Sequence, residues 1–187
     1  MTHFTIEKPF FKHKEQGCFG ISLANLLKEM GEDRLAMRVY YNFFHIYKNS
    51  LLGEGFKVPR AIGTQVVSDL TYGRYEGILQ FDEQLFRRRA HLHYPESYKE
   101  ILRVLDEEKE KGRIIQRISS FEYEPPALIH VRFEDDKGKR LHSLVDCGNN
   151  LYIDGSNKRK NELEDLKNWL GIESVLTLNY KWGIKGR

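Results

Sequence analysis

The chain has 187 residues, of which 40% are hydrophobic and 30% are charged, and its formal net charge at pH 7 is +3. This length fits a single domain with a sizeable core, and the composition is that of a soluble globular protein. The small net charge argues against nucleic acid as the main partner, and no apolar run approaches the roughly 20 residues that span a bilayer.

The cysteine count and the first residues predict a compartment. Residues 1–5 lack the basic-then-apolar order of a secretory signal, and two cysteines are too few for a disulfide framework. We therefore expect a cytoplasmic protein with free thiols, no membrane contact and no cofactor. A disulfide between Cys18 and Cys147 is the alternative, and it would block any reaction of Cys18. The oligomeric state is left open.

The first half of the chain has the periodicity of helices. Residues 18–30 are amphipathic and precede Gly31, a residue suited to closing a helix. Residues 32–50 repeat apolar side chains at spacings of three and four, and residues 61–72 and 95–111 are also expected to be helical. Residues 73–86 show no clear period.

After Gly112 the pattern changes to that of strands. A short helix closed by Gly171 is expected over residues 162–170. Helices followed by strands favour an α+β fold, with N-terminal helices packed on a C-terminal antiparallel β-sheet. The expected strands cover residues 113–119, 127–133, 141–145, 151–154 and 175–180.

Cys18 stands at the start of the first expected helix, directly after Gly17. The backbone N–H groups of a first helical turn have no partner within the helix, and the positive end of the helix dipole lies there. Both effects stabilise a thiolate, so Cys18 is a candidate nucleophile. The alternative is a small buried side chain on a core helix, because free cysteine is among the most buried residue types.

The expected hairpin over residues 141–154 supplies candidate partners for this thiol. His142 lies on one strand and Asp154 on the next, and cross-strand neighbours on one face are within side-chain reach. Cys18, His142 and Asp154 could therefore form a Cys-His-Asp triad. Asp146 and Asn157 compete for the role of orienting the histidine, although Asp146 is placed to form the turn. Cys147 is interpreted as structural.

This order of residues resembles the papain-like cysteine peptidase fold. The segment Cys-Phe-Gly-Ile-Ser-Leu-Ala-Asn-Leu-Leu from Cys18 looks like the nucleophile helix of bacteriocin-leader peptidases and Josephin-type deubiquitinases, and the segment around His142 and Asp154 is similar to their histidine hairpin. The resemblance implies a single papain-like domain over residues 1–187, with a helical insertion at roughly 32–97.

The resemblance also implies a hydrolase that cleaves a peptide or isopeptide bond in a peptide or protein substrate. These families usually carry an oxyanion-hole glutamine five or six residues before the cysteine, where this chain has Lys12 and His13. Gln16, two residues before Cys18, is the candidate for that role. Transglutaminase, deamidase or acyltransferase chemistry on the same triad is an alternative, as is a binding module without turnover.

Two weaker clusters lie in the middle of the chain. His91 and His93 would share a face in an extended segment and could suit zinc, but no further metal-binding motif accompanies them, so no metal is expected. The arginines of residues 87–89 could contact phosphates of nucleic acid, although a solvated basic face is the simpler interpretation.

Overall fold

The computed structural model describes residues 18–47, 60–136, 138–154, 160–162 and 169–181. Within these residues the chain is a mixed α+β protein, as the sequence predicts. The helices come mostly first and are α1 (Cys18–Glu29), α2 (Asp33–Tyr47), the short 3-10 helix η1 (Arg60–Ile62), α3 (Gly63–Leu70), α4 (Glu83–His93) and α5 (Tyr98–Glu110).

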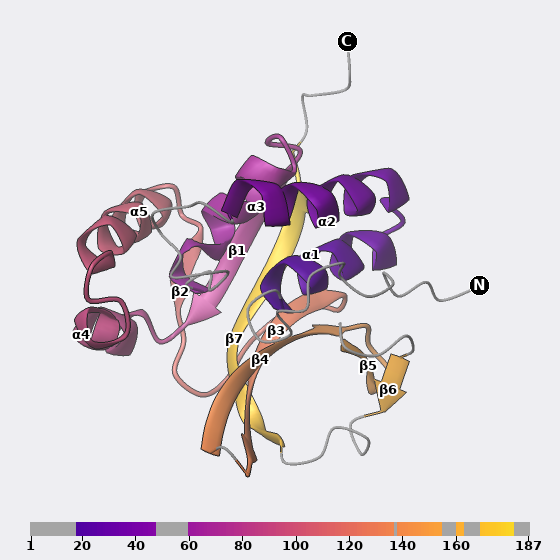
Figure 1. Ribbon diagram of the computed structural model, residues 1–187. Helices are drawn as coiled ribbons and strands as arrows, with labels where there is room; N and C mark the ends of the chain where they lie inside the picture. Colours follow the sequence, from indigo (N-terminus) through magenta and orange to yellow (C-terminus); the bar gives the residue numbers. More distant parts are fainter. Residues whose placement is uncertain (1–17, 48–59, 137, 155–159, 163–168, 182–187) are drawn as a thin grey trace.

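The strands of the described residues form one sheet in the order β2-β1-β7-β3-β4-β5-β6. Helices α1, α2 and α3 cover one face of this sheet, and α4 and α5 lie together at its β2 end (Figure 1). The strands are β1 (Tyr75–Phe81), β2 (Ile114–Gln116), β3 (Ala127–Asp135), β4 (Gly138–Asp146), β5 (Leu151–Asp154), β6 (Lys160–Glu162) and β7 (Trp169–Tyr180).

The sheet is mixed, which corrects the expectation of an antiparallel one. Strands β1 and β2 run parallel, with Leu79 opposite Ile114, whereas the other neighbouring strands are antiparallel. The connection between the parallel strands passes through α4 and α5, as a parallel crossover requires.

Strand β1 also corrects the expected helical insertion over residues 32–97, because it lies inside the sheet between β2 and β7. Its buried positions include Gly77 and Gln80, whereas Ile78 is only partly buried, so the sequence lacks the polar–apolar alternation that identifies a half-exposed strand. The expected helix over 162–170 is contradicted at both ends, since Glu162 belongs to β6 and Trp169 begins β7. Residues 163–168 lie outside the described residues.

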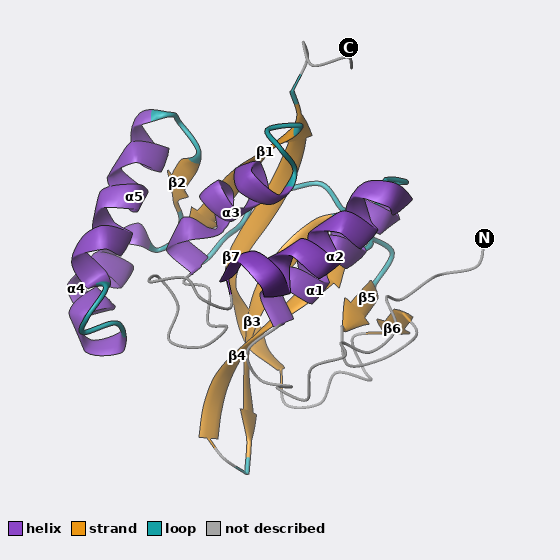
Figure 2. Cartoon of the chain, turned by 45° about the horizontal axis from the view of Figure 1, so that its top comes forward, coloured by secondary structure: helices purple, strands orange, loops and turns teal. Residues whose placement is uncertain are grey.

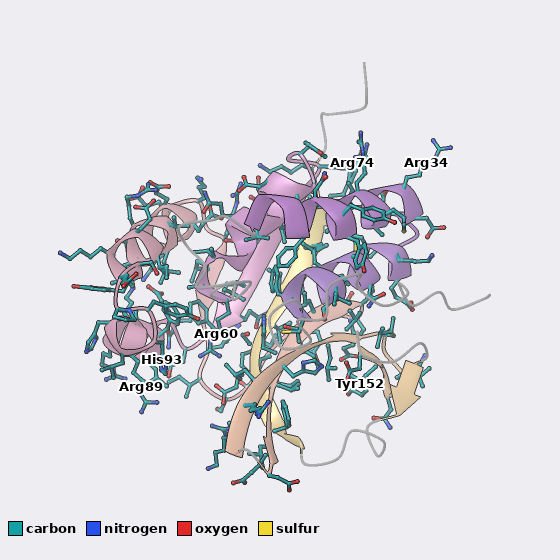
Figure 3. The ribbon with its side chains drawn as sticks, in the orientation of Figure 1. Arg34, Arg60, Arg74, Arg89, His93 and Tyr152 are labelled. Carbon is teal, nitrogen blue, oxygen red and sulfur yellow. The ribbon has the colours of Figure 1, made fainter. Side chains whose placement is uncertain are left out.

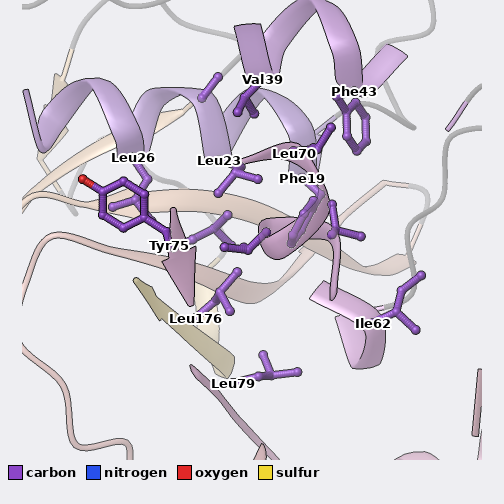
Figure 4. Packing of buried hydrophobic residues seen from close by; sticks show 14 of the residues in the cluster. Phe19, Leu23, Leu26, Val39, Phe43, Ile62, Leu70, Tyr75, Leu79 and Leu176 are labelled. Carbon is purple, nitrogen blue, oxygen red and sulfur yellow. The ribbon is translucent and has the colours of Figure 1, made fainter. Parts of the chain in front are cut away.

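The main core lies between the helices and the sheet. Leu23, Leu26 and Leu27 of α1 are fully buried, each contributing about 1.5–3 kcal/mol by leaving water. They face side chains from α2, α3 and the central strands, including Val39, Leu70 and Leu176 (Figure 4). These contacts hold helix α1, which carries Cys18, against the rest of the core along its length.

The β3–β4 hairpin extends beyond the layer of helices (Figure 2).

Candidate active site

Helix α1 begins at Cys18, at the position the sequence predicts for it. The helix packs on β4 and also contacts β3 and β5. Phe19, the next residue, is buried in the main core, while Cys18 itself is partly exposed and makes no disulfide. The thiol therefore lies at the dipole-positive end of a helix whose position is fixed by packing.

The pKa of Cys18 is lowered, although burial by itself acts to raise it. Hydrogen bonding to His142 and the positive charge of that ring outweigh the burial, and the hydroxyl and backbone N–H of Ser143 lower the pKa further. The thiolate is thus favoured by groups from a single strand, β4. Because a thiolate rather than a thiol attacks carbon, this environment suits a nucleophile.

His142 is held by Asp154 as well as by the thiol. Strand pairing places Asp154 opposite Leu144, so His142 is its diagonal neighbour on the same face. The His142 Nε2 atom lies 2.9 Å from Asp154 Oδ1, which leaves Nδ1 as the ring nitrogen available to Cys18. Burial acts to lower the pKa of His142, but Asp154 and Cys18 together raise it to about 10. The structure therefore brings Cys18, His142 and Asp154 together, with the imidazole between the thiol and the carboxylate.

Ser143 and Ser22 also belong to this site, and neither was predicted from the sequence. Ser22 lies one helical turn after Cys18, and its hydroxyl donates a 3.0 Å hydrogen bond to the Ser143 carbonyl. The bond is buried and fastens α1 to β4 beside the thiol. The i, i+4 spacing of Cys18 and Ser22 was a signal for this contact, but only the pairing of α1 with β4 gives it a partner.

The hydroxyl of Ser143 itself is buried and, within the described residues, has no hydrogen-bond partner other than the Cys18 thiolate. An unpaired buried hydroxyl is unfavourable, so a neighbouring anion that accepts from it gains stability. The thiolate of Cys18 is such an acceptor. Cys18 thus contacts the adjacent residues His142 and Ser143, whose side chains leave opposite faces of β4.

A second histidine, His130 of β3, lies next to Ser143 on the neighbouring strand. It pairs with Ser143 across the two strands, and its Nδ1 atom is 2.8 Å from the hydroxyl oxygen of Ser174. Its ring stacks on Phe19, with 5.9 Å between the ring centroids. Burial first, and then the charges of Arg60 and His142, lower its pKa to about 3. His130 is consequently neutral, and it supports Phe19 beside the candidate nucleophile.

The competing residues occupy other roles or lie elsewhere. Asp146 accepts hydrogen bonds from the Tyr123 hydroxyl at 2.9 Å and from the Gly148 backbone N–H at 2.8 Å, so it forms the turn as expected. Cys147 packs against the edge of the main core. Gln16 and Asn157 lie outside the described residues, and their expected roles stay predictions.

The two weaker clusters fall on helix α4. His91 and His93 were considered in an extended segment, but on a helix residues two apart do not share a face. Arg87 makes ion pairs with Glu83 and Asp106 and is not part of an open basic face. Among the residues that the structure describes, no three potential metal-ligating side chains come together.

Comparison of this chain with known protein families, curated proteins and solved structures finds no match in any of the three. Within the described ranges, no helix has both the length and the apolar character that crossing a membrane requires. The assignment of chemistry therefore depends on the geometry of the site alone.

Proposed function

We propose that this protein is a thiol hydrolase that cleaves a peptide or isopeptide bond in a peptide or protein substrate. Cys18 is the nucleophile, His142 the general acid and base, and Asp154 the residue that orients the imidazole. The observation that carries the proposal is the pairing of Cys18 with His142, whose other ring nitrogen lies 2.9 Å from Asp154.

The reaction follows from the charges in the resting site. With the proton on His142, the Cys18 sulfur attacks the substrate carbonyl carbon, and the C–S bond forms as the carbonyl oxygen becomes an oxyanion. Collapse of this intermediate breaks the C–N bond, and His142 gives its proton to the leaving amine. The imidazole then takes a proton from water, which attacks the thioester. Collapse of this second intermediate breaks the C–S bond, releases the carboxylic acid and leaves the Cys18 thiolate beside the protonated His142.

The oxyanion needs hydrogen-bond donors at the start of α1. The backbone N–H of Cys18 is one candidate, because the first N–H groups of a helix have no acceptor within the helix. Gln16 remains the second proposed donor. Removing one such donor from an enzyme typically lowers kcat by about 10²–10³.

We also propose that this α+β domain has a papain-like fold. The features that support this are a nucleophile on the first turn of α1, a histidine on β4 and a carboxylate on β5, with α1 packed against both strands. Strand β1 and the parallel pair that it makes with the edge strand β2 lie outside this resemblance.

Alkylation with iodoacetamide at pH 6 tests the proposal, with the labelled cysteine identified by mass spectrometry. An ordinary thiol has a pKa near 8.5 and is less than about 1% ionised at that pH, so Cys147 should react slowly. Cys18 should react much faster, and His142→Ala should abolish the difference. In parallel, p-nitrophenyl acetate should give a burst of nitrophenolate and an acetylated Cys18.

Cys147→Ser is the matched control, because it removes the other thiol and leaves the proposed site unchanged. It should retain both the fast alkylation and the burst. Equal labelling of the two cysteines at pH 6, or a burst that survives in Cys18→Ser, would overturn the assignment of Cys18 as the nucleophile.

A further inference from the structure

Three helices end in the same backbone motif, and one of them carries an unusual residue in it. In each, an N–H two residues past the helix cap bonds back to the carbonyl five residues earlier. These bonds are Glu32 to Leu27 at 2.9 Å after α1, Gly73 to Ser68 at 2.8 Å after α3, and Arg113 to Glu108 at 3.0 Å after α5.

The residue just before that N–H must adopt a left-handed conformation, which favours glycine because it has no Cβ. Gly31 has φ of +85° after α1, and Gly112 has φ of +75° after α5. After α3 the position is held by Tyr72, with φ of +54°. A bulky residue with positive φ is an outlier, and such outliers concentrate at sites of recognition and catalysis.

Burial of the ring does not offset the energetic cost of this backbone conformation, because Tyr72 is 61% exposed. Its ring is nevertheless fixed from α2. The Asn42 side-chain amide donates a 2.9 Å hydrogen bond to the Tyr72 hydroxyl, and the Arg38 guanidinium carbon lies 5.5 Å from the ring centroid. The fold therefore holds an aromatic ring in solvent in a defined orientation.

Helix α2, whose Arg38 and Asn42 contact this ring, exposes further aromatic, apolar and basic side chains. Met37 and Tyr41 of α2 are exposed, and Tyr41 packs by its edge against the buried Tyr40. Arg34 and Arg74 lie on the same upper side of the molecule (Figure 3). The Tyr72 surface, as named here, consists of Arg34, Met37, Arg38, Tyr41, Tyr72 and Arg74. The α2 members recur at spacings of three and four, so they share one helix face.

We propose that the Tyr72 surface binds an acidic segment of a partner protein that also carries apolar side chains. Tyrosine, methionine and arginine are the residue types enriched in the centres of protein interfaces. The guanidinium groups match carboxylates in charge and geometry, and a ring that is already fixed loses little entropy on binding.

A nucleic acid fits this surface less well, because Met37 and Tyr41 place apolar area where a phosphate backbone would need cations. Arg74 already forms an ion pair with Glu32 at 3.6 Å, so Arg34 and Arg38 are the groups proposed to meet the partner's carboxylates. The proposal does not rest on the proposed hydrolase function, since Cys18 is not part of the Tyr72 surface.

Fluorescence anisotropy tests the proposal with the full chain and a fluorescein-labelled 16-residue peptide of repeated Glu-Glu-Leu-Phe. The wild type and Cys18→Ser should bind this peptide equally, and a peptide with lysine in place of glutamate should not bind. Tyr72→Gly and Arg38→Ala should each weaken binding about tenfold. Arg89→Ala, which removes an exposed arginine from α4, should bind like the wild type.

Thermal unfolding gives an independent readout, because a residue retained for recognition is not retained for stability. Tyr72→Gly should unfold at the same temperature as the wild type or at a higher one, since glycine relieves the left-handed conformation. The proposal is overturned if the acidic peptide does not bind, or if a labelled dT16 oligonucleotide binds more tightly. It is also overturned if Arg89→Ala weakens binding as much as Arg38→Ala, or if Tyr72→Gly lowers the unfolding temperature by several degrees.

Discussion

His130 should make the fold sensitive to mild acid. In the unfolded chain a histidine has a pKa of about 6.5, whereas burial lowers the pKa of His130 in the fold to about 3. Between these two values the unfolded state binds a proton that the folded state does not. The stabilising effect of the neutral ring is therefore fully present above pH 6.5 and is lost progressively as the pH falls below it.

The size of the loss follows from the two pKa values. From pH 7 to pH 5 the free energy of unfolding should fall by about 2 kcal/mol from His130 alone, at about 1.4 kcal/mol per pH unit below 6.5. For a chain of this length that corresponds to a lower unfolding temperature by about 4–8 °C. Removing the titrating ring should remove this part of the pH dependence.

His130→Gln is the variant that tests this. The glutamine carbonyl can accept the hydrogen bond from Ser174, but the side chain cannot take up a proton in this range. The variant also loses the stacking of the histidine ring on Phe19, and this loss should lower the free energy of unfolding by the same amount at every pH. Urea unfolding at pH 7, 6 and 5 should therefore give a flatter pH profile for His130→Gln than for the wild type. His91→Gln, an exposed histidine on α4, serves as the control and should keep the wild-type slope. Identical slopes for His130→Gln and the wild type would refute the reasoning.

Further variants distinguish the roles of the other side chains in and around the site. Asp154→Ala should leave the circular dichroism spectrum unchanged and slow Cys18 alkylation at pH 6, because His142 loses the carboxylate that raises its pKa. Asp146→Ala should instead lower the free energy of unfolding by about 1–3 kcal/mol, since it leaves the Tyr123 hydroxyl without its acceptor, and should leave labelling intact. If Asp146→Ala abolished labelling and Asp154→Ala did not, the triad would have to be redrawn. Ser143→Ala should shift the pH profile of Cys18 alkylation to higher pH, because the thiolate loses a hydroxyl donor; an unchanged profile would exclude that role. Ser22→Ala should destabilise the fold by about 1–3 kcal/mol in urea unfolding, because the buried Ser143 carbonyl loses its donor.

Local sequence pattern determined the elements that carry the candidate triad. The mostly apolar run of residues 19–27, all of them buried, and Gly31 after it indicate where α1 begins and ends, because a helix forms through contacts within four residues. The turn at residues 148–150 joins two short strands, which brings Asp154 back to within reach of His142. Both features depend on neighbours in the sequence, so periodicity and turn residues were sufficient to predict them.

Tertiary structure decided what surrounds these elements. The contact of Cys18 with His142 joins residues more than a hundred positions apart, and only the packing of α1 on β4 determines which side chains meet there. The Ser22–Ser143 hydrogen bond and the burial of His130 arise from the same packing, and no spacing along the sequence identifies Ser143 as the partner of Ser22. Strand β1 escaped prediction because Gly77 and Gln80 occupy buried positions while Ile78 is only partly buried, so polar and apolar residues do not alternate along it. The sequence places the end of a helix near Tyr72, but nothing in it indicates that tyrosine rather than glycine takes the left-handed position there, which the backbone hydrogen bonds after α3 impose. Short-range periodicity encodes an element, whereas the neighbours of each side chain depend on contacts between distant segments, which no local pattern contains.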